Sequence, residues 1–371
     1  MRNKNPVISI LIASYNHESY IKEAIDSILN QTYTNFELII TDDGSADNSV
    51  NVIKTITDSR VRLFEFKHNK GACEATNNSL KHAKGQYIAI MNSDDVWVQD
   101  KLEKQITILE KNEDIDAVFS SAGFFDVHLQ PFTSDKQPYF ADIFNQKNRS
   151  SATWLQYFFY NGNCLCHPSI LIRKSCYDEL GLYDNRFRQL PDFDMWIKFC
   201  KKFTLHVLPE KLVKFRILDD NRNASSPSIE NRIRGNNEHF LIMESFFDGM
   251  SIDTFKEAFF KQLRNPKFES EIEFKIEKAF IFLNSAFCII GIKQLYELLG
   301  QEQSTEILNN KYNFGDKEFQ KVLSSNNSFN IQDSSSLVRS LFCKVLHYPK
   351  IALVKLIFRK TYSYLRNKFI K

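Results

Sequence analysis

The feature that most constrains this chain is a regular alternation of apolar runs and helix-patterned segments in its first third. Each apolar run favours a buried strand, and each following segment has apolar residues three or four positions apart, as in an amphipathic helix. Such alternation with short connections is typical of a parallel sheet covered on both faces. We expect strands at 7–13, 36–45, 60–67 and 86–92 and helices at 18–31, 47–56, 71–85 and 98–112.

The rest of the chain has a mixed pattern that becomes helical toward its end. Later strand or helix patterns lie at 116–126, 167–184, 192–203 and 205–218. The turn-rich segment 219–228 separates them from a long helical region without a polar cluster. We therefore expect three parts, which are residues 1–225, 226–330 and 331–371.

Composition excludes several classes of protein. The chain is 43% hydrophobic and 25% charged, as ordinary globular proteins are. Its seven cysteines form no C-x-x-C pair, so neither a zinc site nor a disulfide framework is indicated, and a reducing cytoplasm suits them. The apolar run at 7–13 is too short for a signal peptide.

Three of the expected strands end in polar residues of similar chemistry. In parallel sheets, ligands bind beyond the carboxyl ends of the strands. Because these ends lie at one edge of the sheet, we expect their side chains to form one site. They are Ser14, Tyr15 and Asn16 after the first strand, Asp42 and Asp43 after the second, and Asn92, Asp94 and Asp95 after the fourth.

The adjacent carboxylates of Asp94 and Asp95 have two explanations. An acid placed before the helix at 98–112 can cap that helix. Capping accounts for one acid, but not for two beside a second pair, Asp42 and Asp43. Crowded carboxylates repel one another unless a cation neutralises them. Oxygen ligands suit Mg²⁺ or Mn²⁺, which also bind phosphates, so the pattern favours such an ion at Asp94 and Asp95.

Two stretches carry a resemblance to a known family. They are "ISILIASYNHESYIKEAIDSILNQTYTNFELIITDDGSADNS" and "HNKGACEATNNSLKHAKGQYIAIMNSDDVW". Their motifs and order resemble the family 2 glycosyltransferases from about residue 6 to residue 225. The resemblance implies the GT-A fold, a Rossmann-like α/β fold with a mixed, mainly parallel sheet flanked by helices. It also implies a nucleotide-sugar donor, with UDP the commonest nucleotide, and Mg²⁺ or Mn²⁺ at a D-x-D-type motif.

The resemblance also implies which residues contact the donor. Asn92-Ser93-Asp94 occupies the D-x-D frame, with Asn92 where Asp is common, so Asn92 is expected to hydrogen-bond the ribose. Tyr15 suits stacking on the base, and Asp43 is expected to face it, although "DDGS" alone is typical of a tight turn. The implied donor contacts are Ser14, Tyr15, Asn16, Asp42, Asp43, Gly71, Asn77, Asn92, Ser93 and Asp94.

A catalytic base is implied by the run "LPDFDMW". It matches the family's "E-D-x-D-x-W" stretch, with Asp192 at the base and Pro191 where Glu is common. The alternative is that these acids only begin a helix, where Asp is favoured. Further acceptor or phosphate contacts are expected at His167, Asp194 and Arg216, with Arg222 as a substitute for Arg216.

The C-terminal tail differs from the rest in charge. Residues 337–371 hold nine Lys/Arg and no acid, so the net charge of +3 becomes 3 − 9 = −6 without them. Apolar residues of the tail share one helical face, as in helices that bind anionic membranes. Packing on the protein is the alternative, and no motif supports nucleic-acid binding. We expect peripheral attachment at the inner face of the cytoplasmic membrane.

These observations favour an inverting glycosyltransferase, of hexosyl or N-acetylhexosaminyl type. We expect it to use a glycan or lipid-linked glycan acceptor in surface polysaccharide biosynthesis. Two alternatives stay open, a sugar nucleotidyltransferase and a non-catalytic sugar- or partner-binding protein on the same fold. The nucleotidyltransferase would leave Asp192 without a role, and a binding protein needs neither metal nor base.

Overall fold

A computed structural model describes residues 6–132, 142–218 and 228–326. The first strands and helices alternate along the chain, as the sequence predicts. They are β1 (Ile8–Ser14), α1 (Ile21–Leu29), β2 (Phe36–Asp42), α2 (Ser49–Lys54), β3 (Val61–Glu65), α3 (Ala72–His82), β4 (Tyr87–Asn92), β5 (Val96–Trp97) and α4 (Lys101–Lys111).

The following elements complete the sheet and then become helical. They are β6 (Ala117–Phe125), α5 (Ser151–Asn161), the 3₁₀ helix η1 (His167–Ser169), β7 (Leu171–Arg173), α6 (Lys174–Leu180), α7 (Pro191–Cys200) and β8 (Leu205–Arg216). The helical region holds α8 (Ile229–Glu244), α9 (Ile252–Phe259), η3 (Phe260–Gln262), α10 (Glu271–Leu283), α11 (Cys288–Leu299), α12 (Glu302–Tyr312) and α13 (Asp316–Ser325).

The strands form one eight-stranded sheet in the order β3-β2-β1-β4-β7-β6-β8-β5. Strands β3, β2, β1 and β4 are parallel to one another, and β6 is parallel to β8. Strand β7 is antiparallel to both β4 and β6, and β5 is antiparallel to β8. The sheet is therefore mixed, and its parallel part carries the strand ends that the sequence singles out.

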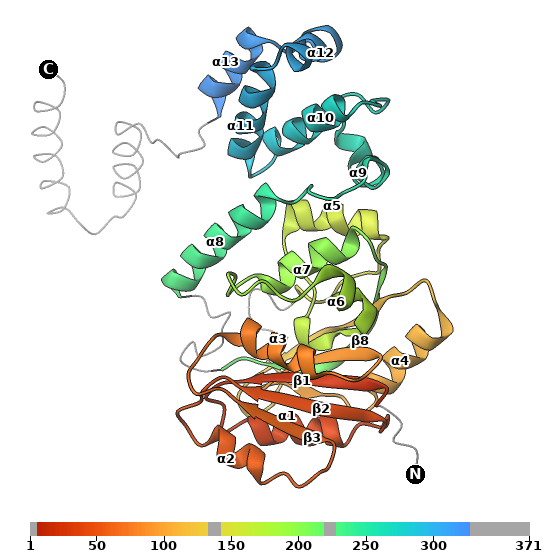
Figure 1. Cartoon of the computed structure of the whole chain (residues 1–371), viewed down its shortest axis with the longest axis vertical. Helices are drawn as coiled ribbons and strands as arrows, with labels where there is room; N and C mark the ends of the chain where they lie inside the picture. Colours follow the sequence, from red (N-terminus) through yellow and green to blue (C-terminus); the bar gives the residue numbers. More distant parts are fainter. Residues whose placement is uncertain (1–5, 133–141, 219–227, 327–371) are drawn as a thin grey trace, which may run out of the picture. The chain divides into compact units, whose positions relative to one another are not determined.

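Two hydrophobic cores cover opposite faces of the sheet. Alternate residues of β1 point to opposite sides, as strand geometry requires. Ile10 packs with residues of α1 and α4, whereas Leu11 packs with residues of α3, α5 and α7. Figure 1 shows α1 and α3 on opposite sides of β1 and β2. The apolar character of both strand faces, read from the sequence, reflects this double burial.

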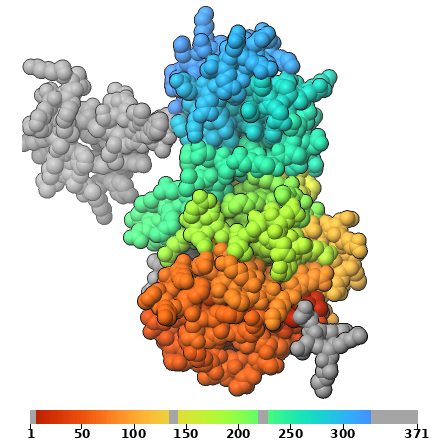
Figure 2. Space-filling model, viewed as in Figure 1, coloured from red at the N-terminus to blue at the C-terminus, as the bar shows by residue number. Residues whose placement is uncertain are grey.

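The chain divides into two compact units, residues 1–290 and 291–371. In the space-filling view, the part from β1 to α4 of the first unit forms one continuous body (Figure 2). The boundary predicted near residue 225 and the tail at 331–371 lie outside the described residues. Within the described ranges, no helix is both long and apolar enough to cross a membrane.

Candidate functional site

The structure brings the three polar strand ends together at one edge of the sheet. Ser14 at the end of β1 is level with Asp42 at the end of β2. On its other side, β1 pairs with β4, where Ala13 is level with Asn92. The hydroxyl of Ser93 and Nδ1 of His17 lie 2.7 Å apart, which joins the ends of β1 and β4. The predicted convergence is confirmed.

The turn after β2 is held by side chains of the predicted site. The carboxylate of Asp42 accepts hydrogen bonds from the backbone and hydroxyl of Ser45, at 2.8 and 2.7 Å. Oδ1 of Asn16 accepts one from the backbone of Ala46 at 2.8 Å. Gly44 has a φ of 73°, and a Cβ there would lie 2.7 Å from the backbone of His68. Asp42 and Asn16 thus shape the turn that presents Asp43.

The carboxylate of Asp43 receives two backbone N–H groups from a neighbouring loop. Lys70 and Gly71 donate to it at 2.6 and 2.9 Å. Burial raises the pKa of Asp43, and these two hydrogen bonds oppose the shift. A Cβ on Gly71 would meet no atom within 4 Å, so its φ of 97°, rather than crowding, favours glycine. Open space therefore lies over the start of α3, beside Asp43.

Two residues at the end of β1 have unusual surroundings. Oγ of Ser14 is fully buried, and within the described ranges it makes no hydrogen bond. The ring of Tyr15 is 43% exposed, although it directly follows a buried strand. A buried hydroxyl without a partner is costly, and the exposed ring of Tyr15 offers a surface on which a planar ligand can stack.

Asp94 and Asp95 lie in a tight turn after β4 and differ in their contacts. Oδ2 of Asp95 accepts from the amide of Asn92, and its Oδ1 accepts from the backbone of Arg216, both at 2.8 Å. Burial raises the pKa of both acids, and the neighbouring charge of Asp94 raises that of Asp95 further. The carboxylate of Asp95 therefore holds the turn. The expectation that Asp94 binds a cation rests on its place in the D-x-D frame and stays a prediction.

Arg216 holds the same turn from β8. Its Nε donates to the carbonyl of Asp94 at 2.7 Å, and its Nη2 lies 2.5 Å from the carboxylate of Glu23. Nη1 donates to the carbonyl of Val127. Its side chain is only 2% exposed. These contacts give Arg216 a positioning role, and its predicted contact with a phosphate stays a prediction.

Asp192 lies in the first turn of α7, apart from the strand ends in sequence. Its Oδ2 accepts a hydrogen bond from the amide of Asn163 at 2.7 Å, and its Oδ1 accepts one from the backbone of Phe193 at 2.9 Å. Burial raises the pKa of Asp192, whereas the nearby imidazole of His167 and the bond from Asn163 lower it. The group is a partly buried carboxylate whose two oxygens are both held by hydrogen bonds.

His167 belongs to a chain of aromatic polar groups beside Asp192. Its Nε2 lies 3.0 Å from the hydroxyl of Tyr183, which lies 2.8 Å from that of Tyr177. Burial lowers the pKa of His167, and the charge of Asp192 opposes that shift. The contacts orient the imidazole within the protein, and a contact with acceptor or phosphate stays a prediction.

Asp194 and Asn77 have their polar groups engaged by neighbours. Oδ2 of Asp194 lies 2.6 Å from Nζ of Lys198, one turn along α7. The amide of Asn77 binds both the N–H and the carbonyl of Tyr183, at 3.0 and 2.8 Å. Asn77 thereby joins α3 to the segment before α7, and its predicted contact with the donor is untested.

A carboxylate from α8 holds the segment that leads into α7. Glu238 accepts hydrogen bonds from the backbone N–H groups of Arg188, Gln189 and Leu190, at 2.8 to 2.9 Å. Glu238 is buried. Leu190 directly precedes α7, and Asp192 lies in the first turn of that helix. The three bonds therefore fix where α7 begins and, with it, the position of Asp192.

We expect Glu238→Ala to lower the free energy of unfolding by about 2–4 kcal/mol, since three buried N–H groups lose a charged acceptor. Chemical denaturation of the purified protein measures this. Glu230→Ala is the matched control on the same helix, because Glu230 is exposed, and it should change stability by less than about 0.5 kcal/mol. Equal effects of the two substitutions would contradict this role of Glu238.

Several residues of the site have no signal in the sequence. They are His17, Glu23, Asn163, Tyr183 and Glu238. Tyr183 lies 16 positions from its partner His167, and Glu23 lies 193 positions from its partner Arg216. Local patterns report neighbours within a few positions, so such contacts appear only once the chain is folded.

Comparison with known proteins agrees with this geometry. The sequence model of the family described as "Glycosyl transferase family 2" matches residues 9–180. Glycosyltransferase MJ1057 of Methanocaldococcus jannaschii, described as uncharacterized, is 31% identical over 220 residues, which are 57% of this chain and 71% of that protein. RT0329 of Rickettsia typhi, likewise an uncharacterized glycosyltransferase, is 34% identical over 58% of this chain and 65% of its own length.

A third relative has a more specific name. It is the UDP-Glc:alpha-D-GlcNAc-diphosphoundecaprenol beta-1,3-glucosyltransferase WfgD of Escherichia coli, which is 44% identical over 106 residues, 29% of this chain and 42% of WfgD. This match covers a minority of both chains.

Two solved structures have the same fold. TarS of S. aureus in complex with UDP has a TM-score of 0.52, with 14% identity, 87% of this chain covered and 90% of that chain. The mannosyltransferase PcManGT of Pyrobaculum calidifontis, in complex with GDP-Man and Mn²⁺, has a TM-score of 0.50, with 15% identity and coverage of 87% and 86%. The fold and the site thus define a GT-A-type nucleotide-sugar fold, which confirms the predicted fold class. This chain belongs to the family 2 glycosyltransferases.

Proposed function

We propose that this protein is an inverting glycosyltransferase that moves a sugar from a UDP-sugar to a hydroxyl of a glycan or lipid-linked glycan. The observation that carries the proposal is the pair of carboxylate sites, Asp94–Asp95 at the end of β4 and Asp192 at the start of α7. Burial raises the pKa of all three acids. Buried carboxylates with perturbed pKa values gather at catalytic sites. Polysaccharide biosynthesis is the expected setting, and the name of WfgD, which includes a GlcNAc-diphosphoundecaprenol, supports a lipid-linked acceptor.

The donor is proposed to lie over the ends of β1, β2 and β4, in the domain of residues 1–225. Tyr15 would stack on the base, and the carboxylate of Asp43 would face it. The unpartnered hydroxyl of Ser14 would bond the nucleotide, and Asn92 the ribose. The UDP complex of TarS supports this placement by fold alone.

The residues of the β4 turn fit a hard divalent cation. Carboxylate oxygens are the ligands that Mn²⁺ and Mg²⁺ prefer. Crowding of Asp94 and Asp95 raises the pKa of Asp95, and a cation would relieve that repulsion. Asp94 is the proposed direct ligand because it holds the closing position of the D-x-D frame, whereas the carboxylate of Asp95 bonds Asn92 and Arg216 and holds the turn. When bound, the ion would neutralise charge on the diphosphate leaving group.

Asp192 is the proposed general base. Its carboxylate would take the proton of the acceptor hydroxyl as that oxygen attacks the anomeric carbon. The bond from that carbon to the diphosphate oxygen breaks on the opposite face, which inverts the configuration. Asn163 and the backbone of Phe193 hold the carboxylate in one orientation for this step.

Asn163→Ala is expected to move the acid limb of the pH profile of kcat/KM to higher pH. The bond from Asn163 lowers the pKa of Asp192, so its loss raises that pKa and leaves less carboxylate at a given pH. Initial rates between pH 5 and 9 measure the limb. Asn161→Ala, at the exposed end of α5, is the matched control and should leave the limb in place. A shift to lower pH would contradict the proposed role of the bond.

The place of action is proposed to be the cytoplasmic face of a membrane. The basic tail at 331–371, which lies outside the described residues, would supply peripheral contact. Flotation with anionic vesicles tests this attachment in the full chain and in a chain ending at residue 330. If the vesicles bound both chains equally, the proposed role of the tail in membrane contact would be refuted.

Calorimetric titration with UDP and GDP, with and without Mn²⁺, tests the proposed function. Mn²⁺-dependent binding of UDP supports it, and preference for GDP would change the donor. Product analysis separates the alternatives. UDP release with sugar transfer is expected, pyrophosphate release would indicate a nucleotidyltransferase, and neither would indicate a binding protein.

A further inference from the structure

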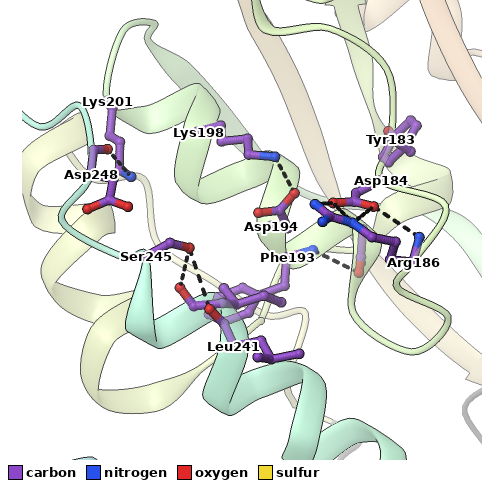
Figure 3. Close-up of polar contacts among 12 residues, drawn as sticks. Tyr183, Asp184, Arg186, Phe193, Asp194, Lys198, Lys201, Leu241, Ser245 and Asp248 are labelled. Carbon is purple, nitrogen blue, oxygen red and sulfur yellow. Dashed lines mark hydrogen bonds and ion pairs between the residues drawn. The ribbon is translucent and has the colours of Figure 1, made fainter. Parts of the chain in front are cut away.

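A cavity of about 800 Å³ lies between the segment before α7, helix α7 and helix α8. Its volume is within the range of small-molecule sites, about 300–1,000 Å³. Leu241 of α8 and Ser245, which directly follows α8, border it on one side, and Asp184 and Asp194 border it on the other. Figure 3 shows these side chains. The proposed donor site does not use this cavity.

Most of the acids in the cavity wall are neutralised within the protein. Asp184 pairs with Arg186 at 2.6 Å, and Asp194 pairs with Lys198 at 2.6 Å (Figure 3). Glu238 binds the three N–H groups before α7. These pairs leave the wall with few charges that still need a partner.

Two guanidinium groups of the wall keep spare hydrogen-bond donors. Within the described ranges, the guanidinium of Arg188 has no bond, and that of Arg234 has one weak bond to Asn231 at 3.2 Å. The wall holds four acids and four bases, so its net charge is 4 − 4 = 0, but both oxygens of Glu238 accept backbone N–H groups, which leaves Glu230, one turn before Arg234, as the exposed acid. Two guanidinium groups with spare donors suit phosphate, which they can bind in pairs of hydrogen bonds.

The same wall exposes aliphatic surface. Ile233 and Leu241 line the cavity and are 57% and 54% exposed. With Ile229 and Phe240, α8 holds four of the eleven exposed large hydrophobic residues of the described ranges. Single exposed apolar residues are ordinary, but such a concentration on one helix indicates an interaction surface.

We propose that this cavity binds an anionic amphiphile, with a phosphate or diphosphate group against Arg188 and Arg234 and an alkyl chain against Ile233 and Leu241. This inference rests on the proposed function, under which the amphiphile is the lipid-phosphate part of the acceptor. Asp192 and Asp194 are two positions apart on α7, so they project about 200° apart around its axis. The cavity beside Asp194 therefore takes a part of the acceptor distant from the reacting hydroxyl.

Farnesyl diphosphate, titrated calorimetrically in metal-free buffer with EDTA, is the probe. Arg188→Gln/Arg234→Gln is expected to weaken its binding by about tenfold or more, since two charge-assisted contacts are lost. Glu230→Gln should tighten binding a few-fold by removing the opposing charge, within the range of about 0.5 kcal/mol per exposed pair. Arg232→Gln, an exposed residue outside the cavity wall, is the matched control and should have no effect.

Inorganic pyrophosphate and vesicles of phosphatidylglycerol separate the sources of phosphate. The proposal expects pyrophosphate to bind at least tenfold more weakly than farnesyl diphosphate, and Ile233→Ser/Leu241→Ser to weaken only the latter. Equal binding of both ligands, or farnesyl diphosphate binding unchanged by the arginine variants, overturns it. Capture by vesicles that depends on the same arginines, without farnesyl diphosphate binding, assigns the surface to a membrane instead and also overturns it. Since no metal or UDP is present, these outcomes are independent of the UDP titration.

Discussion

Replacing Asp192 by Asn is expected to lower kcat by about 10²–10⁴-fold while UDP binding stays unchanged, because only the proton acceptor is lost. Asn keeps the size of the side chain and one oxygen, so the bond from Asn163 or that from Phe193 can persist. Initial rates with saturating UDP-sugar measure the first effect, and calorimetry with UDP and Mn²⁺ measures the second.

Asp194→Asn is the matched control for this experiment. Asp194 lies two positions further along α7, and its carboxylate pairs with Lys198 at the surface of the cavity. We expect its replacement to change kcat by less than tenfold, since a partly exposed pair contributes about 0.2–1 kcal/mol. A larger loss in Asp194→Asn than in Asp192→Asn would assign the base to Asp194.

Asp94→Ala is expected to remove the dependence of UDP binding on Mn²⁺ and to lower kcat/KM by at least about 10²-fold, because the proposed ligand of the ion is lost. Calorimetry of UDP with and without Mn²⁺ gives the first effect, and initial rates over a Mn²⁺ series give the second. Undiminished Mn²⁺ dependence in this variant would refute the assignment of Asp94.

Asp95→Ala separates ligation from positioning. Its carboxylate holds the amide of Asn92 and the backbone of Arg216, so its loss should lower the melting temperature even without metal. We expect Asp94→Ala to change that temperature less. If both variants had equal stability and equal loss of Mn²⁺ dependence, the two acids would share the ion.

The parallel part of the fold could be predicted from the sequence because its signals are local. Runs such as Ile8–Ser14 are apolar on both faces, and α1 and α3 have helical spacing. Once β1, β2 and β4 are parallel, their polar ends lie at one edge of the sheet, so the location of the site follows without further information. Helix α5, by contrast, was not anticipated, since polar residues precede it and its apolar face forms only by packing.

The partners of the predicted acids could not be read from the sequence. Arg216 reaches Asp94 across 122 positions, and Asn163 reaches Asp192 across 29. The spacing of apolar residues within a segment does not indicate contacts between residues so far apart in the sequence. The strand ends pointed to Asp94 and Asp95, and the resemblance to family 2 glycosyltransferases pointed to Asp192, whereas the structure supplied the groups that orient these acids and shift their pKa values.

The three N–H groups that Glu238 binds have a consequence for exchanging parts between related enzymes. A chimera joined near residue 225 would keep the strands, the cation site and Asp192, yet would take α8 from another parent. It would then lose the carboxylate that fixes the start of α7, unless the donor helix supplied an acid at the same place. A junction beyond Glu244 would instead keep α8 with the strands, so that the base and its support are inherited together.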